Sequence, residues 1–141
     1  MRPIVEKIAK EIFHLPTPSS ATKMKLINNL CLGSFMATLA ECTALAESCE
    51  IPKAKALEIL GVGGGQSLVL KAKTQKLIDE DFSAHFSNNA INKDLHLLQD
   101  LAYNLKLPLY SAAIPKELFS KMKMMGKGEE DFSSIYQLFK K

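Results

Sequence analysis

Residues 21–49 read ATKMKLINNLCLGSFMATLAECTALAESC, a stretch that holds no proline and only one glycine, Gly33. Because proline and glycine are the residues that most often interrupt a helix, this stretch predicts one unbroken helix. At about 28 residues it would be about 42 Å long. Its apolar residues cover most of its circumference, so we expect it to be buried on several sides. One apolar face is marked by Leu26, Leu30, Gly33, Ala37 and Ala40, and another by Ile27, Cys31, Phe35, Leu39 and Ala46.

The residues before this helix predict two short elements and a connector. Apolar residues at spacings of three and four predict an amphipathic helix over residues 3–11, and residues 12–15 predict a short strand. Pro16 and Pro18 exclude a continuing helix and favour an extended connector. A strand needs a partner, and the rest of the chain offers none, so residues 1–18 resemble the end of another domain.

Ser19 and Ser20 are candidate N-caps of the long helix, and Ile51-Pro52 ends it. Beyond it, the apolar spacing predicts several shorter helices separated by glycine-containing or polar breaks. The sequence therefore predicts an all-α, multi-helix bundle around one long central helix, apart from the strand. The predicted helices are 53–60, 66–76, 89–105, one that begins at Pro108 and kinks at Pro115, and 131–140, and the predicted breaks are 61–65, 79–87 and 126–128.

The composition is that of an ordinary folded domain. The chain has 141 residues, enough for one domain with a short extension, and 47% of them are apolar. No 18 consecutive uncharged apolar residues occur, so we expect no membrane span, and the charged N-terminus is unlike a signal peptide. Cys31, Cys42 and Cys49 lack disulfide-framework and metal-site spacing. We therefore expect free thiols, buried as small apolar groups on a helix, and a cytoplasmic location.

Several common kinds of site are disfavoured. Of the 18 basic residues only Arg2 is an arginine, and tryptophan is absent, which argues against a nucleic-acid surface. The glycine-rich residues 61–65 lack the last glycine of a dinucleotide fingerprint, because Gln66 stands there, so we expect a hinge between helices. The three histidines lie far apart and show no metal-ligand spacing, so we expect no metal site.

Lys25 and Asn29 are the most informative polar pair. They are four residues apart and therefore lie on one face of the predicted helix. A partly buried lysine near the helix N-terminus could exchange protons near neutral pH, and the Asn29 amide could bind a small polar ligand. The alternative is structural: a lysine that extends into solvent and an amide that caps the helix.

Phe86, Lys93 and Asp94 form a second group. Phe86 lies in the predicted loop, whereas Lys93 and Asp94 lie early in the following helix. A carboxylate there complements the positive end of the helix dipole. The alternative is an exposed first turn without a function.

Together and in this order, these groups resemble the C-terminal domain of the β-hydroxyacid dehydrogenases. That family includes 3-hydroxyisobutyrate dehydrogenase, tartronate semialdehyde reductase and the glyoxylate/succinic semialdehyde reductases, with 6-phosphogluconate dehydrogenase as a larger relative. The resemblance runs from about Arg2 to Lys140 and begins with KLINN at residues 25–29, which is similar to the family's Lys-x-x-Asn-Asn. It continues through Met36-Ala37, Ala40-Glu41, Asp81-Phe82, Phe86, Lys93-Asp94-Leu95, Gly126-x-Gly128 and Asp131-Phe132-Ser133.

The resemblance implies a role for each candidate residue. Lys25 would be the general acid/base that moves the hydroxyl proton while hydride passes to or from a nicotinamide cofactor, NAD or NADP. Asn29 would hold the substrate and orient that lysine, Phe86 and Asp94 would line the substrate site, and Lys93 would contact the cofactor. The substrate would be a small β-hydroxyacid or its semialdehyde. An alcohol that is oxidised by hydride loss needs a base at its oxygen, which a lysine can supply.

The resemblance also implies a domain organisation. Residues 1–18 would be the end of the family's dinucleotide-binding domain plus a linker, and residues 19–141 the helical substrate and dimerisation domain. We therefore expect the chain alone to be inactive and to form a homodimer or larger homo-oligomer through the apolar faces of its long helix. Ser19 and Ala21 stand where the family usually has glycines, and Pro16 replaces another, which bears on specificity. The alternative is a helical dimerisation module without catalytic activity.

Overall fold

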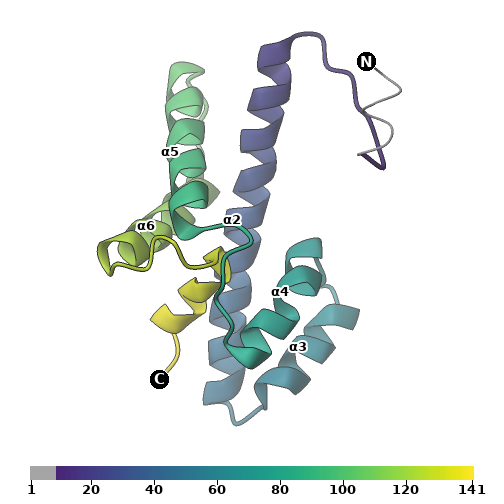
Figure 1. Ribbon diagram of the computed structural model, residues 1–141, viewed down its shortest axis with the longest axis vertical. Coiled ribbons are helices and arrows are strands. Elements are labelled where there is room, and N and C mark those ends of the chain that lie inside the picture. The colour runs from purple at the N-terminus through teal and green to yellow at the C-terminus, as the bar shows by residue number, and fades with distance from the viewer. Residues whose placement is uncertain (1–8) are drawn as a thin grey trace.

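The computed structural model describes residues 9–141. Within that range the chain forms five α-helices and one 3-10 helix, and no strand (Figure 1). The predicted all-α bundle around one long helix is confirmed. In chain order the elements are α2 (Pro18–Ser48), α3 (Lys53–Val62), α4 (Leu68–Asp79), α5 (Asn88–Asn104), α6 (Tyr110–Met124) and η1 (Phe132–Leu138).

The long helix α2 is the axis on which the other elements pack. Figure 1 shows α5 beside its N-terminal half, with α6 behind, and α3 and α4 beside its C-terminal half. All five other elements contact it. The core that results is continuous and includes the fully buried side chains of Met36, Leu77, Leu95, Phe119 and Tyr136.

The two ends of α2 differ slightly from the prediction. Its N-cap is Thr17, whose Oγ1 accepts a hydrogen bond from the Ser20 N–H at 3.2 Å, so Ser19 and Ser20 lie inside the first turn. Pro18 occupies the start of the helix, where a backbone N–H has no acceptor within the helix. The missing N–H of proline therefore costs no helical hydrogen bond there. The helix ends at Ser48, and Glu50 then adopts a left-handed conformation with φ of 60°.

The strand predicted over residues 12–15 is wrong. This segment has no regular structure, and Phe13 within it is 83% exposed. A lone extended segment has no hydrogen-bond partner for its backbone, so a strand cannot form without a neighbouring one. The helix predicted over residues 3–11 falls largely outside the described residues, and residues 9–11 are not helical.

The shorter helices match the prediction with shifted ends. Ser67 and Ser87 cap α4 and α5 by accepting from the backbone N–H of the third residue after them, at 3.0 and 3.2 Å. The helix expected from Pro108 begins at Tyr110, because Pro108 stays in the connector. The expected α-helix at the C-terminal end is instead a 3-10 helix with Asp131 as its N-cap.

The two apolar faces predicted for α2 differ in burial. Leu26, Gly33, Ala37 and Ala40 are buried in the bundle, so the small-residue face belongs to the core and is not free for a partner. The N-terminal half of the other face is exposed instead, because no helix within residues 9–141 covers it. We call these residues the α2 stripe: Met24, Ile27, Cys31 and Phe35, of which the three larger side chains are 50%, 45% and 50% exposed.

The cysteines and the membrane prediction also need correction. All three thiols are free, as expected, but Cys31 and Cys49 are exposed and only Cys42 is partly buried. By length and composition alone, α2 meets the requirements for a membrane-spanning helix, contrary to the sequence-based expectation. In its most apolar window 44% of the residues are buried inside the bundle. A core helix passes the same test, so this is weak evidence for a membrane.

Pro115 lies inside α6 and leaves one backbone carbonyl without its usual donor. A proline has no N–H, so the carbonyl of the residue four positions earlier, Ser111, loses its helical hydrogen bond. The Ser34 hydroxyl of α2 donates to that carbonyl at 3.1 Å. The helix therefore continues through the proline, and the same bond fastens α6 to α2.

We predict that Ser34→Ala lowers the free energy of unfolding by about 0.5–1 kcal/mol, the usual net value of one hydrogen bond. In a Pro115→Ala background the restored N–H can bind the Ser111 carbonyl, so the same substitution should have a smaller effect. Urea unfolding of the two single variants and the double variant measures this coupling. Thr22→Ala, at an exposed position of α2, is the control. Equal effects of Ser34→Ala in both backgrounds would contradict the assignment.

Candidate active site

Lys25, Asn29 and Asp94 meet where α2 and α5 pack side by side. The Asn29 Nδ2 donates to the Asp94 Oδ2 at 2.7 Å, and the Lys25 Nζ lies 3.0 Å from the same oxygen. Lys25 and Asn29 are one helical turn apart on α2, and Asp94 lies in the second turn of α5. One carboxylate oxygen therefore joins the two residues that the sequence singled out.

Burial differs sharply within this cluster. The Asp94 side chain is 3% exposed and Asn29 is 4% exposed, whereas the Lys25 side chain is 60% exposed. A buried carboxylate needs hydrogen-bond donors, and here the amide and the ammonium supply them. The prediction that Lys25 is partly buried is therefore wrong. The hydrogen-bonded Asn29–Asp94 pair holds the Lys25 amine in a fixed place at the surface.

Lys93 adds a second cation to the same site. Its Nζ lies 4.0 Å from the Asp94 Oδ1, and its side chain is 69% exposed. Lys93 is exposed and Asp94 is buried, and the roles predicted for both residues stay predictions. Two exposed ammonium groups around one buried carboxylate leave a net positive charge, which favours an anionic ligand.

Phe86 is held by contacts with other residues. Its ring packs edge-on against Phe132 with 5.8 Å between centroids, and its backbone N–H donates to the Asp131 Oδ2 at 3.2 Å. It is partly buried against the core. Its predicted role in lining the substrate site stays a prediction.

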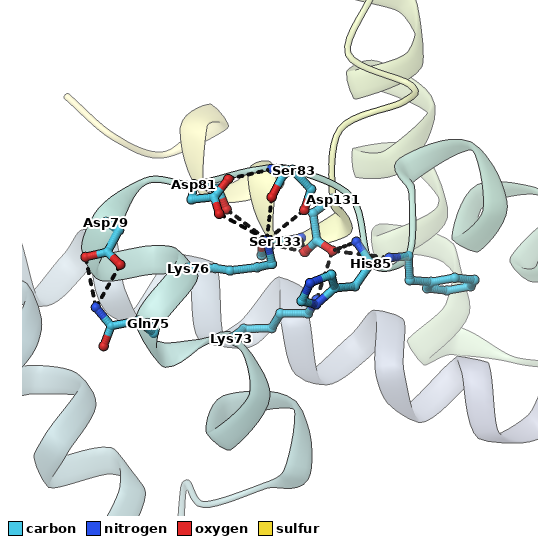
Figure 2. Close-up of polar contacts among 10 residues, drawn as sticks. Lys73, Gln75, Lys76, Asp79, Asp81, Ser83, His85, Asp131 and Ser133 are labelled. Atoms are coloured by element: carbon cyan, nitrogen blue, oxygen red, sulfur yellow. Dashed lines mark hydrogen bonds and ion pairs between the residues drawn. The ribbon is translucent and has the colours of Figure 1, made fainter. Parts of the chain in front are cut away.

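A second polar cluster, centred on Asp131, was not predicted from the sequence (Figure 2). The Asp131 Oδ2 lies 2.9 Å from the Lys73 Nζ and accepts the His85 N–H at 3.0 Å. The Ser133 hydroxyl donates to the Asp131 Oδ1 at 2.7 Å. Lys76 also points into this region and donates to the Ser83 carbonyl at 2.7 Å. The cluster fastens the loop before α5 to α4 and η1, and its signals in the sequence were the Asp-x-Ser spacing of an N-cap and the place of Asp131-Phe132-Ser133 in the family resemblance, to which no role was given.

The environment of Asp131 lowers its pKa. Burial acts to raise the pKa of this carboxyl, but the hydrogen bonds from Ser133, Lys73 and the His85 backbone outweigh burial and hold it below the usual range. The carboxylate and the Lys73 ammonium, whose side chain is 6% exposed, are thus a buried ion pair. Both partners are enclosed, so this pair is structural.

Two further features of the sequence are the glycine-rich segment and the absence of metal-ligand spacing. Gly61 and Val62 end α3, residues 63–65 lie in the connection to α4, and the predicted hinge stays a prediction. Within residues 9–141 no group of three or more His, Cys, Asp or Glu side chains could hold a metal ion.

The chain is an all-α bundle domain in which a lysine and an amide of the long helix contact a carboxylate of a neighbouring helix. Its similarity to known proteins identifies the family. A family profile described as "NAD-binding of NADP-dependent 3-hydroxyisobutyrate dehydrogenase" matches residues 19–139. The chain belongs to this family of hydroxyacid dehydrogenases. The matched range contains Lys25, Asn29, Lys93 and Asp94.

Individual relatives agree with the family. The chain is 31% identical over 140 residues to 2-(hydroxymethyl)glutarate dehydrogenase of Eubacterium barkeri, covering 99% of this chain and 46% of the relative. It is 32% identical over 134 residues to the human cytokine-like nuclear factor N-PAC, covering 95% of this chain and 24% of that protein. The crystal structure of 3-hydroxyisobutyrate dehydrogenase from Salmonella typhimurium superposes with a TM-score of 0.92 at 27% identity, covering 97% of this chain and 48% of that chain. The chain thus spans half or less of the length of these relatives.

The Asp131 cluster generates a prediction about acid sensitivity. Because folding lowers the pKa of Asp131, the stability that its ionised form contributes is present above the ordinary aspartate pKa of 3.8 and is lost as the pH falls through the lower folded value. Asp131→Asn leaves the buried Lys73 without a counter-charge, so we expect a loss of about 3–5 kcal/mol at pH 7.

The measurement is urea unfolding of parent and variant between pH 7 and pH 2.5. The difference in unfolding free energy should be constant above about pH 4 and shrink below it. Asp100→Asn, at an exposed carboxylate of α5, is the control and should change stability by less than about 0.5 kcal/mol. A difference that does not change with pH would show that the charge of Asp131 is not what stabilises the cluster.

Proposed function

We propose that this chain is the helical half of an NAD(P)-dependent oxidoreductase that acts on a small β-hydroxyacid or its semialdehyde. The observation that carries the proposal is the Lys25–Asp94–Asn29 cluster, in which a buried carboxylate holds an exposed amine at 3.0 Å. Membership of a hydroxyacid dehydrogenase family supports the reaction class.

In this proposal Lys25 is the general acid/base. Its amine takes the proton of the substrate hydroxyl during oxidation and returns a proton to the carbonyl oxygen during reduction. When bound, NAD or NADP would accept the hydride during oxidation and donate it during reduction.

Asn29 and Asp94 act on the substrate mainly through Lys25. Both are almost fully buried, and their mutual hydrogen bond fixes the oxygen that the Lys25 ammonium contacts. The exposed Lys25 and Lys93 would face the ligands. The Lys93 ammonium fits the expected contact with the cofactor, because it is exposed and lies beside the same carboxylate. Such fixed geometry is what proton transfer in an active site requires.

The proposal includes a domain organisation. Residues 19–141 form the helical domain, residues 1–18 are the end of a dinucleotide-binding domain with its linker, and the protein works in the cytoplasm. The 141 residues contain no Gly-x-Gly-x-x-Gly, and hydride transfer requires a positioned nicotinamide. We therefore expect the isolated chain to turn over no hydroxyacid.

A second candidate function is a helical interaction module without catalytic activity. The observation that favours it is the 32% identity to N-PAC, a relative whose name describes a nuclear factor and no enzyme. The same helical fold can therefore belong to proteins of different function. The role of Lys25 separates the two candidates.

We predict that Lys25→Ala in the full-length protein lowers kcat by two or more orders of magnitude and leaves the KM for the nicotinamide cofactor nearly unchanged. A proton-transfer group acts in the transition state and contributes little to cofactor binding. Steady-state kinetics with NAD and NADP against a panel of small β-hydroxyacids measures both constants. Lys23→Ala, at an exposed lysine of the same helix, is the matched control. A Lys25→Ala rate within threefold of the parent rate would favour the interaction module.

We also propose that the chain associates with a second copy through the α2 stripe. Met24, Ile27 and Phe35 expose about half of their apolar surface along one side of a helix, and such a continuous patch normally marks a protein contact.

Light scattering on a sizing column at micromolar concentration is expected to show at least twice the monomer mass of 15.6 kDa. A double substitution, Ile27→Glu with Phe35→Glu, should give the monomer, because it places charges in the contact. Lys23→Glu, a charge change beside the stripe, is the control. A monomer across the dilution series for the parent would contradict the proposal.

A further inference from the structure

A buried glycine, Gly33, lies where α2 packs against α5. Lys25, Asn29 and Gly33 follow one another at four-residue intervals, so all three lie on the face of α2 that packs against α5. Gly33 is buried. A Cβ at this position would lie 3.2 Å from the Leu95 Cδ1 and 3.5 Å from the Phe119 Cε2. The first of these distances is shorter than ordinary van der Waals contact.

The neighbouring side chains have little room to yield. Leu95 and Phe119 are both 0% exposed and belong to the continuous core. Interiors packed at this density respond to an added methyl group by small shifts of whole elements. Leu95 directly follows Asp94 on α5, so a displacement of Leu95 also displaces the Asp94 backbone.

We propose that Gly33 is a positioning residue of the Lys25–Asp94–Asn29 cluster: its missing side chain sets the separation of α2 and α5 at which both residues reach Asp94. The contacts that depend on this separation are the 2.7 Å hydrogen bond from Asn29 and the 3.0 Å ion pair with Lys25. The effect of Gly33 on catalysis rests on the function proposed above, whereas its effect on the cluster does not.

The backbone conformation at Gly33 does not require glycine. The residue lies in the middle of α2, where alanine would be the better helix former. The only glycine of this chain with a positive φ is Gly126, among residues 9–141. Because better helix formation offsets the cost of tighter packing, Gly33→Ala should change the melting temperature little while it moves the cluster. If Gly33 served packing alone, Gly33→Ala would lower the melting temperature and leave the cluster unchanged.

The Asn29 side-chain amide provides a direct readout in the 141-residue chain. In a ¹⁵N–¹H correlation spectrum at neutral pH, an amide that donates to a buried carboxylate is shifted downfield and exchanges slowly with solvent. Asp94→Asn should abolish both features and so identify the resonance. We expect Gly33→Ala to raise the exchange rate of the Asn29 amide protons at least about tenfold.

Two further variants test the cause. Gly61→Ala is the matched control, because Gly61 is also helical but its added Cβ would meet only the Leu70 Cδ2, at 3.5 Å. It should leave the Asn29 resonance unchanged. Leu95→Val in the Gly33→Ala background shortens the side chain that the new methyl group meets, and it should restore slow exchange.

The kinetic arm uses the full-length protein. Gly33→Ala should lower kcat at least about tenfold with little change in the KM for the cofactor, and Leu95→Val should recover part of the loss. Lost protection of Asn29 with unchanged kcat would uphold the positioning role and count against the proposed catalytic role of Lys25. Unchanged protection of Asn29 in the Gly33→Ala variant would overturn the inference, whatever the kinetics show.

Discussion

The uninterrupted length of α2 is the constraint on which the rest of this structure depends. A single helix from Pro18 to Ser48 contacts every other element, so each shorter helix takes its place from one of its faces. None of the shorter helices buries a complete core by itself, and α3 and α4 meet α5 and α6 mainly through α2 and η1. The bundle is therefore a set of helices arranged around a shared axis. An interruption of that axis would separate its two ends.

The fold could be predicted because its decisive signals are local. The absence of proline from residues 21–49, the caps Ser67 and Ser87, and the apolar spacing of α5 all act within a few residues of where they stand. The errors occur where the structure depends on residues far away in the sequence. A strand at residues 12–15 requires a partner that local sequence cannot supply, and the 3-10 helix η1 has an N-cap, Asp131, that is held by residues far away in the sequence.

The candidate site could be predicted only in part. Helical periodicity places Lys25 and Asn29 together, and the family resemblance adds Asp94, but only packing shows that all three share one oxygen. Burial was the property least accessible from sequence. Lys25 was expected to be partly buried and is exposed, whereas Lys73 and Lys76, which nothing singled out, are buried. Lys23 and Lys25 are two residues apart on α2, as Lys71 and Lys73 are on α4, so this spacing does not show which lysines the chain encloses.

The two lysine–aspartate pairs show how burial separates structure from chemistry. Their distances are almost equal, 3.0 Å for Lys25–Asp94 and 2.9 Å for Lys73–Asp131, so distance alone does not distinguish them. In the second pair both side chains are enclosed and backbone donors complete the shell of the carboxylate, which leaves no atom for a ligand. In the first pair the carboxylate is enclosed and the amine is open. The enclosed Asp94 carboxylate therefore contacts a lysine whose side chain stays open to solvent. That asymmetry leaves the Lys25 amine, and not the enclosed Lys73 ammonium, accessible to a ligand from solvent.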